Sequence, residues 1–151
     1  MNKNITIISI LHRTWIVVVA MLIIACSNQD DDQDSVSAIV DSVWEYSINN
    51  PDGFTVEIPS LNTPTSGLAV GYYIGQENVG KESLTDVVNH ALNNGKFVGG
   101  WLDTEDGQYY FDSICIFEDG AHDEAEQFAI DNQQRAYYDL KNEVTIYVIL
   151  E

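Results

Sequence analysis

The residue best suited to chemistry in this chain is an acid within an apolar, aromatic strand. Asp112 lies in the run 108–117, two positions after Tyr110 and directly before Ser113. A buried carboxylate needs hydrogen-bonding or charged partners, and functional sites are often where such groups occur. Asp112 is therefore either a functional acid or a structural strut that bonds Ser113, a turn amide or Arg135.

A large aromatic residue lies across a short hairpin from this acid. Trp101 belongs to the run 97–102, and the turn 103–107 leads from it to the strand that carries Asp112. Trp101 and Phe111 offer large apolar area, so we expect both to pack in the core of the domain. If Trp101 is instead exposed, its indole becomes a candidate partner contact, because tryptophan is common at the energetic centres of interfaces.

The nucleophiles and bases of the chain form no recognisable catalytic set. Cys115 lies in the middle of a strand, and no basic neighbour in sequence lowers the pKa of its thiol, which favours a structural cysteine. No Gly-x-Ser-x-Gly nucleophile elbow is present. A small hydrolase that uses Asp112, His90 or His122 stays an alternative, and it requires a cleft that joins at least two of these side chains.

The sequence predicts neither a cofactor nor a metal site. His90 and His122 are far apart, whereas zinc usually needs a closer pair and a third ligand. The turn 103–107 resembles a fragment of a calcium loop, but the twelve-residue EF-hand pattern is absent. Aspartate and glycine are expected in any hairpin turn.

The N-terminal segment has the features of a signal peptide that ends at a cysteine. Lys3 and Arg13 precede or flank an apolar run over residues 15–25, which is shorter than the roughly 20 residues of a membrane helix. Ala25, a small residue, directly precedes Cys26. The alternative is a transmembrane anchor with an incidental cysteine.

The five residues that end at Cys26, Leu-Ile-Ile-Ala-Cys, resemble a lipobox, the cleavage and acylation signal of bacterial lipoproteins. The resemblance implies that residues 1–25 are removed and that several acyl chains on Cys26 anchor the chain in a membrane. Residues 27–34 are polar and acidic, and we expect residues 26–42 to form an acidic flexible tether. The acids at 30–32 also resemble the export signal of Bacteroidota surface lipoproteins, although no lysine precedes them. This resemblance implies the outer membrane and display at the cell surface, with the periplasmic face as the alternative.

The charge of the chain limits its partners. The formal net charge is −18, and two of the six basic residues precede Cys26 whereas all 24 acidic residues follow it. Four basic and 24 acidic residues give the processed chain a net charge of −20. This charge disfavours nucleic acid and anionic lipid as direct partners and permits a basic protein partner. With Cys26 acylated, Cys115 has no partner for a disulfide.

Residues 43–151 are expected to form a single α+β domain. Apolar alternation and helical spacing predict the order ββ-α-ββ-α-ββ, which favours a mainly antiparallel sheet of five to six strands with two helices on one face. The helices begin at Ser83 and near Ala121. The predicted strands cover residues 54–58, 68–74, 97–102, 108–117, 134–140 and 144–150.

The segment before this domain is ambiguous. Val36, Ile39, Val40 and Val43 have helical spacing, whereas residues 44–48 alternate like a short strand. We expect a weak helix followed by extended chain, with the well-packed domain beginning near residue 43.

Short motifs in the domain resemble a group of small bacterial proteins of unknown function. The resemblance covers roughly Gly53 to the C-terminus and implies no activity that can be transferred. The motifs are Gly53-Phe54-Thr55, Thr63-Pro64-Thr65-Ser66-Gly67, Val98-Gly99-Gly100-Trp101, Tyr110-Phe111-Asp112-Ser113 and Asn132-Gln133-Gln134-Arg135-Ala136 with Asp139-Leu140.

These observations favour a membrane-tethered, acidic, non-enzymatic interaction domain of an envelope lipoprotein. A second interpretation is an immunity- or inhibitor-type lipoprotein that neutralises a basic toxin or enzyme, because the negative charge would complement such a target. The small hydrolase is the third interpretation.

Overall fold

The computed structural model describes residues 34–75 and 77–149. One compact unit begins at residue 36 and contains the sheet and the helices that cover it. The predicted signal segment and the acylation site at Cys26 lie outside the described residues. No helix in the described part of the chain is long and apolar enough to cross a membrane.

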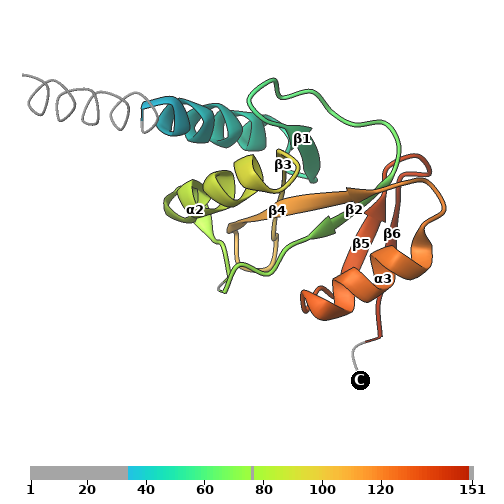
Figure 1. The fold of residues 1–151 in the computed structure, drawn as a ribbon. Coiled ribbons are helices and arrows are strands. Elements are labelled where there is room, and N and C mark those ends of the chain that lie inside the picture. Colours follow the sequence, from blue (N-terminus) through green and yellow to red (C-terminus); the bar gives the residue numbers. More distant parts are fainter. Residues whose placement is uncertain (1–33, 76, 150–151) are drawn as a thin grey trace, which may run out of the picture. The chain divides into compact units, whose positions relative to one another are not determined.

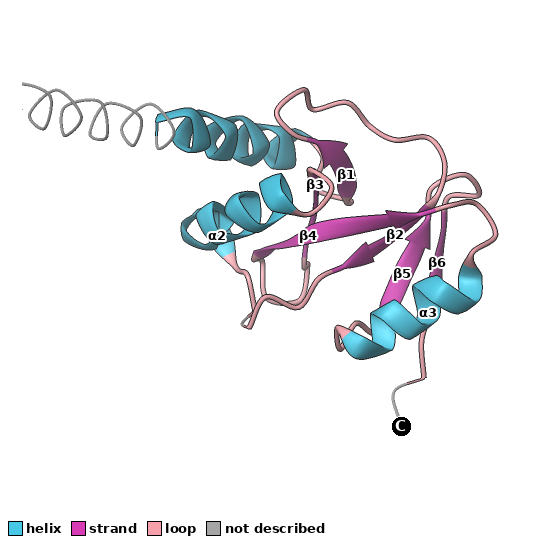
Figure 2. Ribbon diagram, viewed as in Figure 1, coloured by secondary structure: helices cyan, strands magenta, loops and turns pink. Residues whose placement is uncertain are grey.

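The folded unit alternates helices with pairs of strands (Figures 1 and 2). The helix over residues 34–49, here named the lead helix, joins the two helices predicted to lie on the sheet, and it is longer than the weak helix expected in this segment. The strand pairs follow the predicted order. The other elements are β1 (Phe54–Glu57), β2 (Leu68–Gly71), α2 (Gly80–Asn93), β3 (Phe97–Leu102), β4 (Tyr109–Phe117), α3 (His122–Asp131), β5 (Ala136–Asp139) and β6 (Val144–Tyr147).

The six strands form one antiparallel sheet in the order β1-β3-β4-β2-β5-β6. The hairpins β3–β4 and β5–β6 pair strands that are neighbours in the chain. β2 lies between β4 and β5 instead of beside β1. β4 is therefore an interior strand, as its two largely apolar faces predict. It pairs with β3 on one side and with β2 on the other.

All three helices pack on the same side of the sheet, here named the helix face. Alternation along β4 places Phe111, Ser113 and Phe117 on this face. Phe111 packs in one cluster with the lead helix and α2, and the ring of Phe117 contacts Phe128 of α3 at 5.3 Å between centroids.

Two hydrophobic clusters fill the helix face. The first joins the lead helix, α2, β1, β3 and β4, and the second joins α3, β2, β5 and the residues around β6. Burial of each Val or Leu side chain contributes about 1.5–3 kcal/mol. The buried members of the first cluster are Val40, Val43, Ile58, Leu84, Val87, Val88, Ala91, Val98 and Phe111, and those of the second are Leu68, Val70, Ala125, Ala129, Tyr137 and Val148.

The lead helix continues through residues that the sequence predicts to be extended. Residues 44–48 alternate in polarity, yet they are helical up to residue 49. Val40, Val43 and Ser47 lie on one stripe of the helix, and each is buried. The prediction of a short strand here is wrong, because packing of this stripe against the first cluster outweighs a local alternation of five residues.

The packed part of the chain begins before residue 43. Residues 34–42, expected to belong to the flexible tether, are helical, and the side chain of Val40 is only 6% exposed. Lys81 of α2 also forms an ion pair with Asp41 at 2.6 Å. Both partners are exposed, so this pair adds little stability, and the apolar stripe holds the helix in place.

Trp101 does not pack in the core with Phe111, so this prediction is wrong. In the β3–β4 register Trp101 pairs with Tyr110 and Gly100 pairs with Phe111, so the two large side chains lie on opposite faces. Phe111 is 1% exposed, whereas Trp101 is 46% exposed. A Cβ atom at Gly100 would meet Cδ1 of Phe111 at 2.7 Å, so the Phe111 ring occupies the space that glycine leaves free.

We predict unequal costs for truncating these two aromatic side chains. Phe111→Ala should lower the free energy of unfolding by about 3–5 kcal/mol, because it leaves a cavity in the first cluster. Trp101→Ala should cost about 1 kcal/mol, the value of a half-exposed aromatic pair. Urea unfolding of both variants measures the difference. Equal destabilisation would contradict the β3–β4 register.

Candidate functional site

The side of the sheet opposite the helices carries no helix among the described residues, and we name it the open face. Large aromatic side chains reach solvent on it: Trp101 is 46% exposed, Tyr138 38% and Tyr147 80%. Strand register assigns to the open face Thr55, Glu57, Phe97, Gly99, Trp101, Tyr110, Asp112, Ile114, Ile116, Ala69, Gly71, Ala136, Tyr138, Thr145 and Tyr147.

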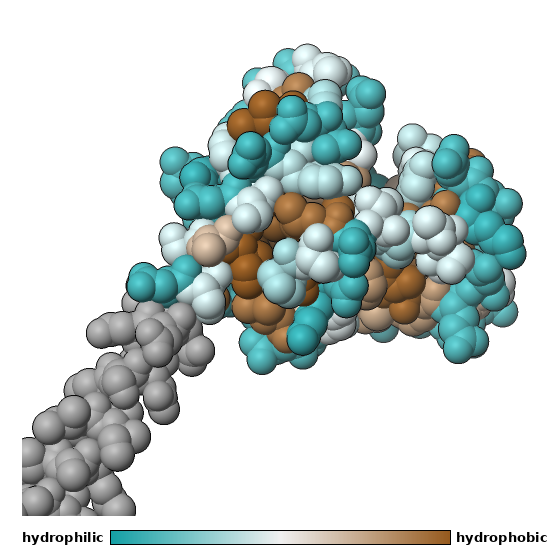
Figure 3. All heavy atoms as spheres, turned by 90° about the horizontal axis from the view of Figure 1, so that it is seen from above, coloured by the Kyte–Doolittle hydropathy of each residue, from teal (hydrophilic) through white to brown (hydrophobic). Residues whose placement is uncertain are grey.

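Exposed apolar side chains also occur elsewhere on the folded unit. Ile48 of the lead helix is 53% exposed and Ile130 of α3 is 40% exposed. Figure 3 shows one side of the described chain, where hydrophobic residues gather in the middle and hydrophilic residues surround them. Exposure alone therefore does not single out the open face, and its arrangement of aromatic and acidic groups has to be considered.

Two aromatic rings of the open face form a stacked pair. The rings of Trp101 and Tyr110 lie 5.4 Å apart between centroids with an interplanar angle of 21°. The Tyr110 hydroxyl donates a 2.7 Å hydrogen bond to Oδ2 of Asp106 in the β3–β4 turn. This bond raises the pKa of Tyr110 to about 12. The turn thus helps to hold the exposed ring pair in a fixed position.

Asp112 lies next to this pair on β4. On the β3 side it pairs with Gly99, which has no side chain. On the β2 side the register continues past the strand end, since the Tyr72 N–H donates to the Ser113 carbonyl at 2.8 Å. Tyr73 therefore falls beside Asp112, and it is 48% exposed.

The carboxylate of Asp112 is partly buried and has no partner in the described part of the chain. Its burial raises its pKa from 3.8 to about 6. The hydroxyl of Ser113 is on the helix face, where it bonds His90, and Arg135 forms no ion pair among the described residues. The described contacts therefore do not support the strut interpretation of Asp112.

The structure does not bring the candidate hydrolase residues together. His90 Nδ1 lies 2.9 Å from Ser113 Oγ on the helix face. His122 Nδ1 lies 3.1 Å from the hydroxyl of Tyr137, beside the second cluster. Asp112 is on the opposite face of the sheet from both contacts. The geometry that the hydrolase interpretation requires is absent from the described residues.

Cys115 lies on the helix face between the two clusters. Burial raises the pKa of its thiol, and a hydrogen bond with Tyr72 partly offsets this shift. The Tyr72 ring in turn contacts the rings of His90 and Phe128, at 4.8 and 4.9 Å between centroids. A partly buried thiol with a raised pKa is a poor nucleophile, which is consistent with the predicted structural role.

The acidic turn between β3 and β4 uses its carboxylates for its own backbone. Asp103 Oδ1 accepts the N–H of Glu105 at 2.8 Å, and Asp106 Oδ1 accepts the N–H of Gln108 at 2.9 Å. Aspartates commonly stabilise turns in this way. Across residues 34–75 and 77–149, no group of three or more His, Cys, Asp or Glu side chains could hold a metal ion.

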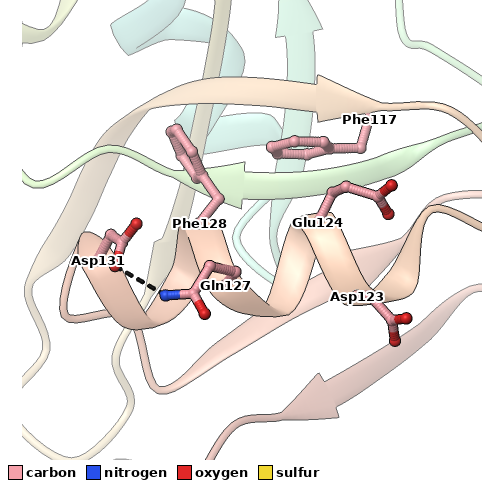
Figure 4. Close-up of a pocket in the computed structure, with 6 residues that line it drawn as sticks. All are labelled: Phe117, Asp123, Glu124, Gln127, Phe128 and Asp131. Carbon is pink, nitrogen blue, oxygen red and sulfur yellow. Dashed lines mark hydrogen bonds between the residues drawn. The ribbon is translucent and has the colours of Figure 1, made fainter.

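A second surface feature, which the sequence did not indicate, lies along α3. It is an open hollow of about 470 Å³ lined by Phe117, Asp123, Glu124, Gln127, Phe128 and Asp131. Figure 4 shows the ring of Phe128 pointing from α3 towards the sheet beside the ring of Phe117, and Gln127 bonded to Asp131 along the helix. Its acidic residues lie on a solvated face of α3, where acids are common, so they do not by themselves indicate a binding site.

Tyr73 and Tyr138 are open-face residues that the sequence analysis missed. Tyr138 pairs with Ala69 of β2, and Tyr73 extends the β2–β4 register beyond Gly71. Alternation within each strand was visible in the sequence. The strand order, which brings these residues and Asp112 onto one surface, was not.

Comparisons of the chain with protein-family models, with curated proteins and with solved structures found no match. The resemblance to small bacterial proteins of unknown function therefore stays a prediction.

We predict that Asp112→Asn stabilises the fold at neutral pH. Because the pKa of Asp112 rises from 3.8 to about 6 on folding, the folded chain keeps a proton that the unfolded chain releases. Stability should therefore fall as the pH rises from about 4 to about 6. Relative to wild type, Asp112→Asn should gain roughly 2–3 kcal/mol at pH 7.5 and less than about 1 kcal/mol at pH 4.

The measurement is chemical unfolding of wild type and Asp112→Asn at both pH values. Asp123→Asn on α3, which removes the same charge from the other side of the sheet, is the matched control. A loss of stability for Asp112→Asn at pH 7.5 would restore the strut interpretation.

Proposed function

We propose that this chain is a membrane-tethered, non-enzymatic interaction domain that binds a basic protein partner through its open face. The observation that carries the proposal is the composition of that face. It combines exposed aromatic side chains with a partly buried, unpartnered acid, and its register positions include no lysine or arginine.

The open face carries more exposed aromatic side chains than the solvent-facing side of an antiparallel sheet usually does. Antiparallel sheets commonly leave one face to water, and the residues on that face are then mostly polar. Here Trp101 is 46% exposed and Tyr147 80% exposed, while Ile114 on the same face is 7% exposed. Aromatic side chains of this kind are enriched at the centres of protein interfaces.

Charge indicates the kind of partner. Two of the four basic residues after Cys26 already pair with acids, Lys81 with Asp41 and Lys141 with Asp119. The processed chain carries a net charge of −20, so its field attracts cationic proteins and repels nucleic acid. A basic toxin or enzyme, as the inhibitor interpretation requires, would use the same surface, whereas the described geometry offers the hydrolase interpretation no site.

The anchor is part of the same proposal. Acyl chains on Cys26 would hold the domain at the outer membrane, and the acids at 30–32 favour its cell-surface side. Protease added to intact cells separates surface display, in which the domain is cleaved, from the periplasmic location, in which it is protected until lysis.

We predict that Cys26 carries the lipid. Cells grown with a fatty-acid analogue should label the wild-type chain, and Cys26→Ala should abolish the label because it removes the acceptor thiol. Cys115→Ala, which leaves the predicted acylation signal intact, is the control and should stay labelled. Equal labelling of wild type and Cys26→Ala would contradict the lipoprotein assignment.

We also predict that the open face is required for partner capture. The full chain, cross-linked in envelope extracts, should capture a basic protein, and Trp101→Ala should reduce capture at least tenfold, since aromatic anchors carry about 2 kcal/mol or more. Ile130→Ala on α3 removes an exposed apolar side chain away from the open face and should leave capture unchanged. Mass spectrometry of the cross-linked product measures the outcome. Capture that survives Trp101→Ala, or an acidic partner, would contradict the proposal.

A further inference from the structure

We propose that Trp101, Tyr110 and Asp112 form a subsite for the guanidinium group of an arginine side chain. The proposal rests on the proposed function, because the arginine belongs to the basic partner that docks on the open face. It adds the chemical group that the partner must present.

The first step is the arrangement of the three side chains. Trp101 and Tyr110 pair across β3 and β4 and stack at 5.4 Å between centroids. Asp112 follows Tyr110 by two residues on the same face, which is about 7 Å along the strand. Its β3 neighbour is Gly99, and the Ile114 side chain lies over this glycine, since a Cβ atom there would meet Cγ1 and Cδ1 of Ile114 at 3.0 Å.

Two groups of this arrangement are not fully satisfied by contacts within the described chain. Asp112 accepts no hydrogen bond and forms no ion pair within the described chain, although it is partly buried. The indole of Trp101 has almost half of its surface free. A ligand that supplies donors to the carboxylate and a flat cationic surface to the ring would satisfy both groups at once.

The third step is the choice of ligand. A guanidinium group is planar, stacks on aromatic faces and presents paired N–H donors that match a carboxylate. A lysine ammonium is a compact, strongly hydrated point charge and uses only the charge of the site. The stacked pair beside a single carboxylate therefore favours arginine over lysine.

Several titratable groups surround the subsite. Tyr110 lies on β4, and the β2–β4 register, continued past Gly71 by the Tyr72–Ser113 hydrogen bond, places Tyr73 beside Asp112. The carboxylates of Glu77, Asp103 and Asp106 are close enough to raise the pKa of Tyr110. Their negative charge adds to the attraction for a cation. Because arginine keeps its proton throughout, a change in binding between pH 5 and pH 7 reports the ionisation of Asp112, whose pKa is about 6.

The test titrates the purified full chain, in a nonionic detergent, with N-acetyl-arginine methylamide. The readouts are the NMR signals of the Trp101 indole N–H and the Gly99 amide. We expect saturable shifts with a dissociation constant in the millimolar range, and binding about fivefold tighter at pH 7 than at pH 5. N-acetyl-lysine methylamide should bind more weakly, and the neutral citrulline analogue should not saturate.

Two matched variants separate the subsite from general acidity. Asp112→Asn should weaken arginine binding at pH 7 about fivefold to tenfold and remove its pH dependence, since a hydrogen bond to a charged group contributes about 1.5 kcal/mol or more. Asp123→Asn on α3 removes one charge on the other side of the sheet and should change neither. Retention of full affinity in Asp112→Asn would overturn the proposal.

The analogue results also distinguish this inference from the docking surface. Equal binding of the lysine or citrulline analogue would overturn the guanidinium subsite. If the arginine analogue fails while capture of a basic protein still depends on Trp101, the subsite is wrong and the docking function stands. If capture is independent of Trp101 while the arginine analogue binds as described, the proposed docking function fails and a guanidinium site remains.

Discussion

The pairing of β3 with β4 determines which chemistry each side of the sheet can carry. Gly100 faces Phe111, and the Phe111 ring fills the space where a side chain at Gly100 would lie. This fit directs Phe111 to the helices and leaves Trp101 and Asp112 on the other side. A slip of one residue would exchange the two faces, burying an acid against α2 and exposing the core.

The polar groups near the sheet differ in the partners that they find. On the helix face His90 bonds Ser113 and His122 bonds Tyr137, whereas Oδ1 of Asn78, whose backbone carbonyl accepts the Phe111 N–H, is buried without a partner among the described residues. Groups bonded in this way act as struts between helix and strand, which explains why they do not assemble into a catalytic set. On the open face the partly buried carboxylate of Asp112 has no protein partner among the described residues and lies beside a stacked aromatic pair. Asp112 is therefore a better candidate for a functional group than His90 or His122, which already bond other side chains.

Much of the local structure could be predicted from the sequence, because alternation and turn residues act over short distances. The bounds of β3 agree with the prediction, and the turn residues 103–107 separate two strands as expected. The size and hydrophobicity of Trp101 predict a core position, whereas its strand parity relative to Phe111 places it on the open face. The lead helix was misjudged because burial of Val43 and Ser47 depends on α2 and β4, which lie far along the chain. The residues that surround Asp112 are determined by the strand order, which cannot be read from a single sequence.

The position of Asp112 links binding to stability. Keeping its charge partly buried without a partner costs the folded chain of order 2–3 kcal/mol at neutral pH, judged from a pKa that rises from 3.8 to about 6. A cationic partner that supplies donors to the carboxylate would lower this pKa again. Part of the interaction energy would then appear as recovered stability, because the unfavourable state exists only in the free domain. Below about pH 6 the same event would also release a proton. Asp112 destabilises the free domain, and a bound cation would remove this destabilisation. Binding at the open face would therefore depend on pH and would raise the stability of the domain.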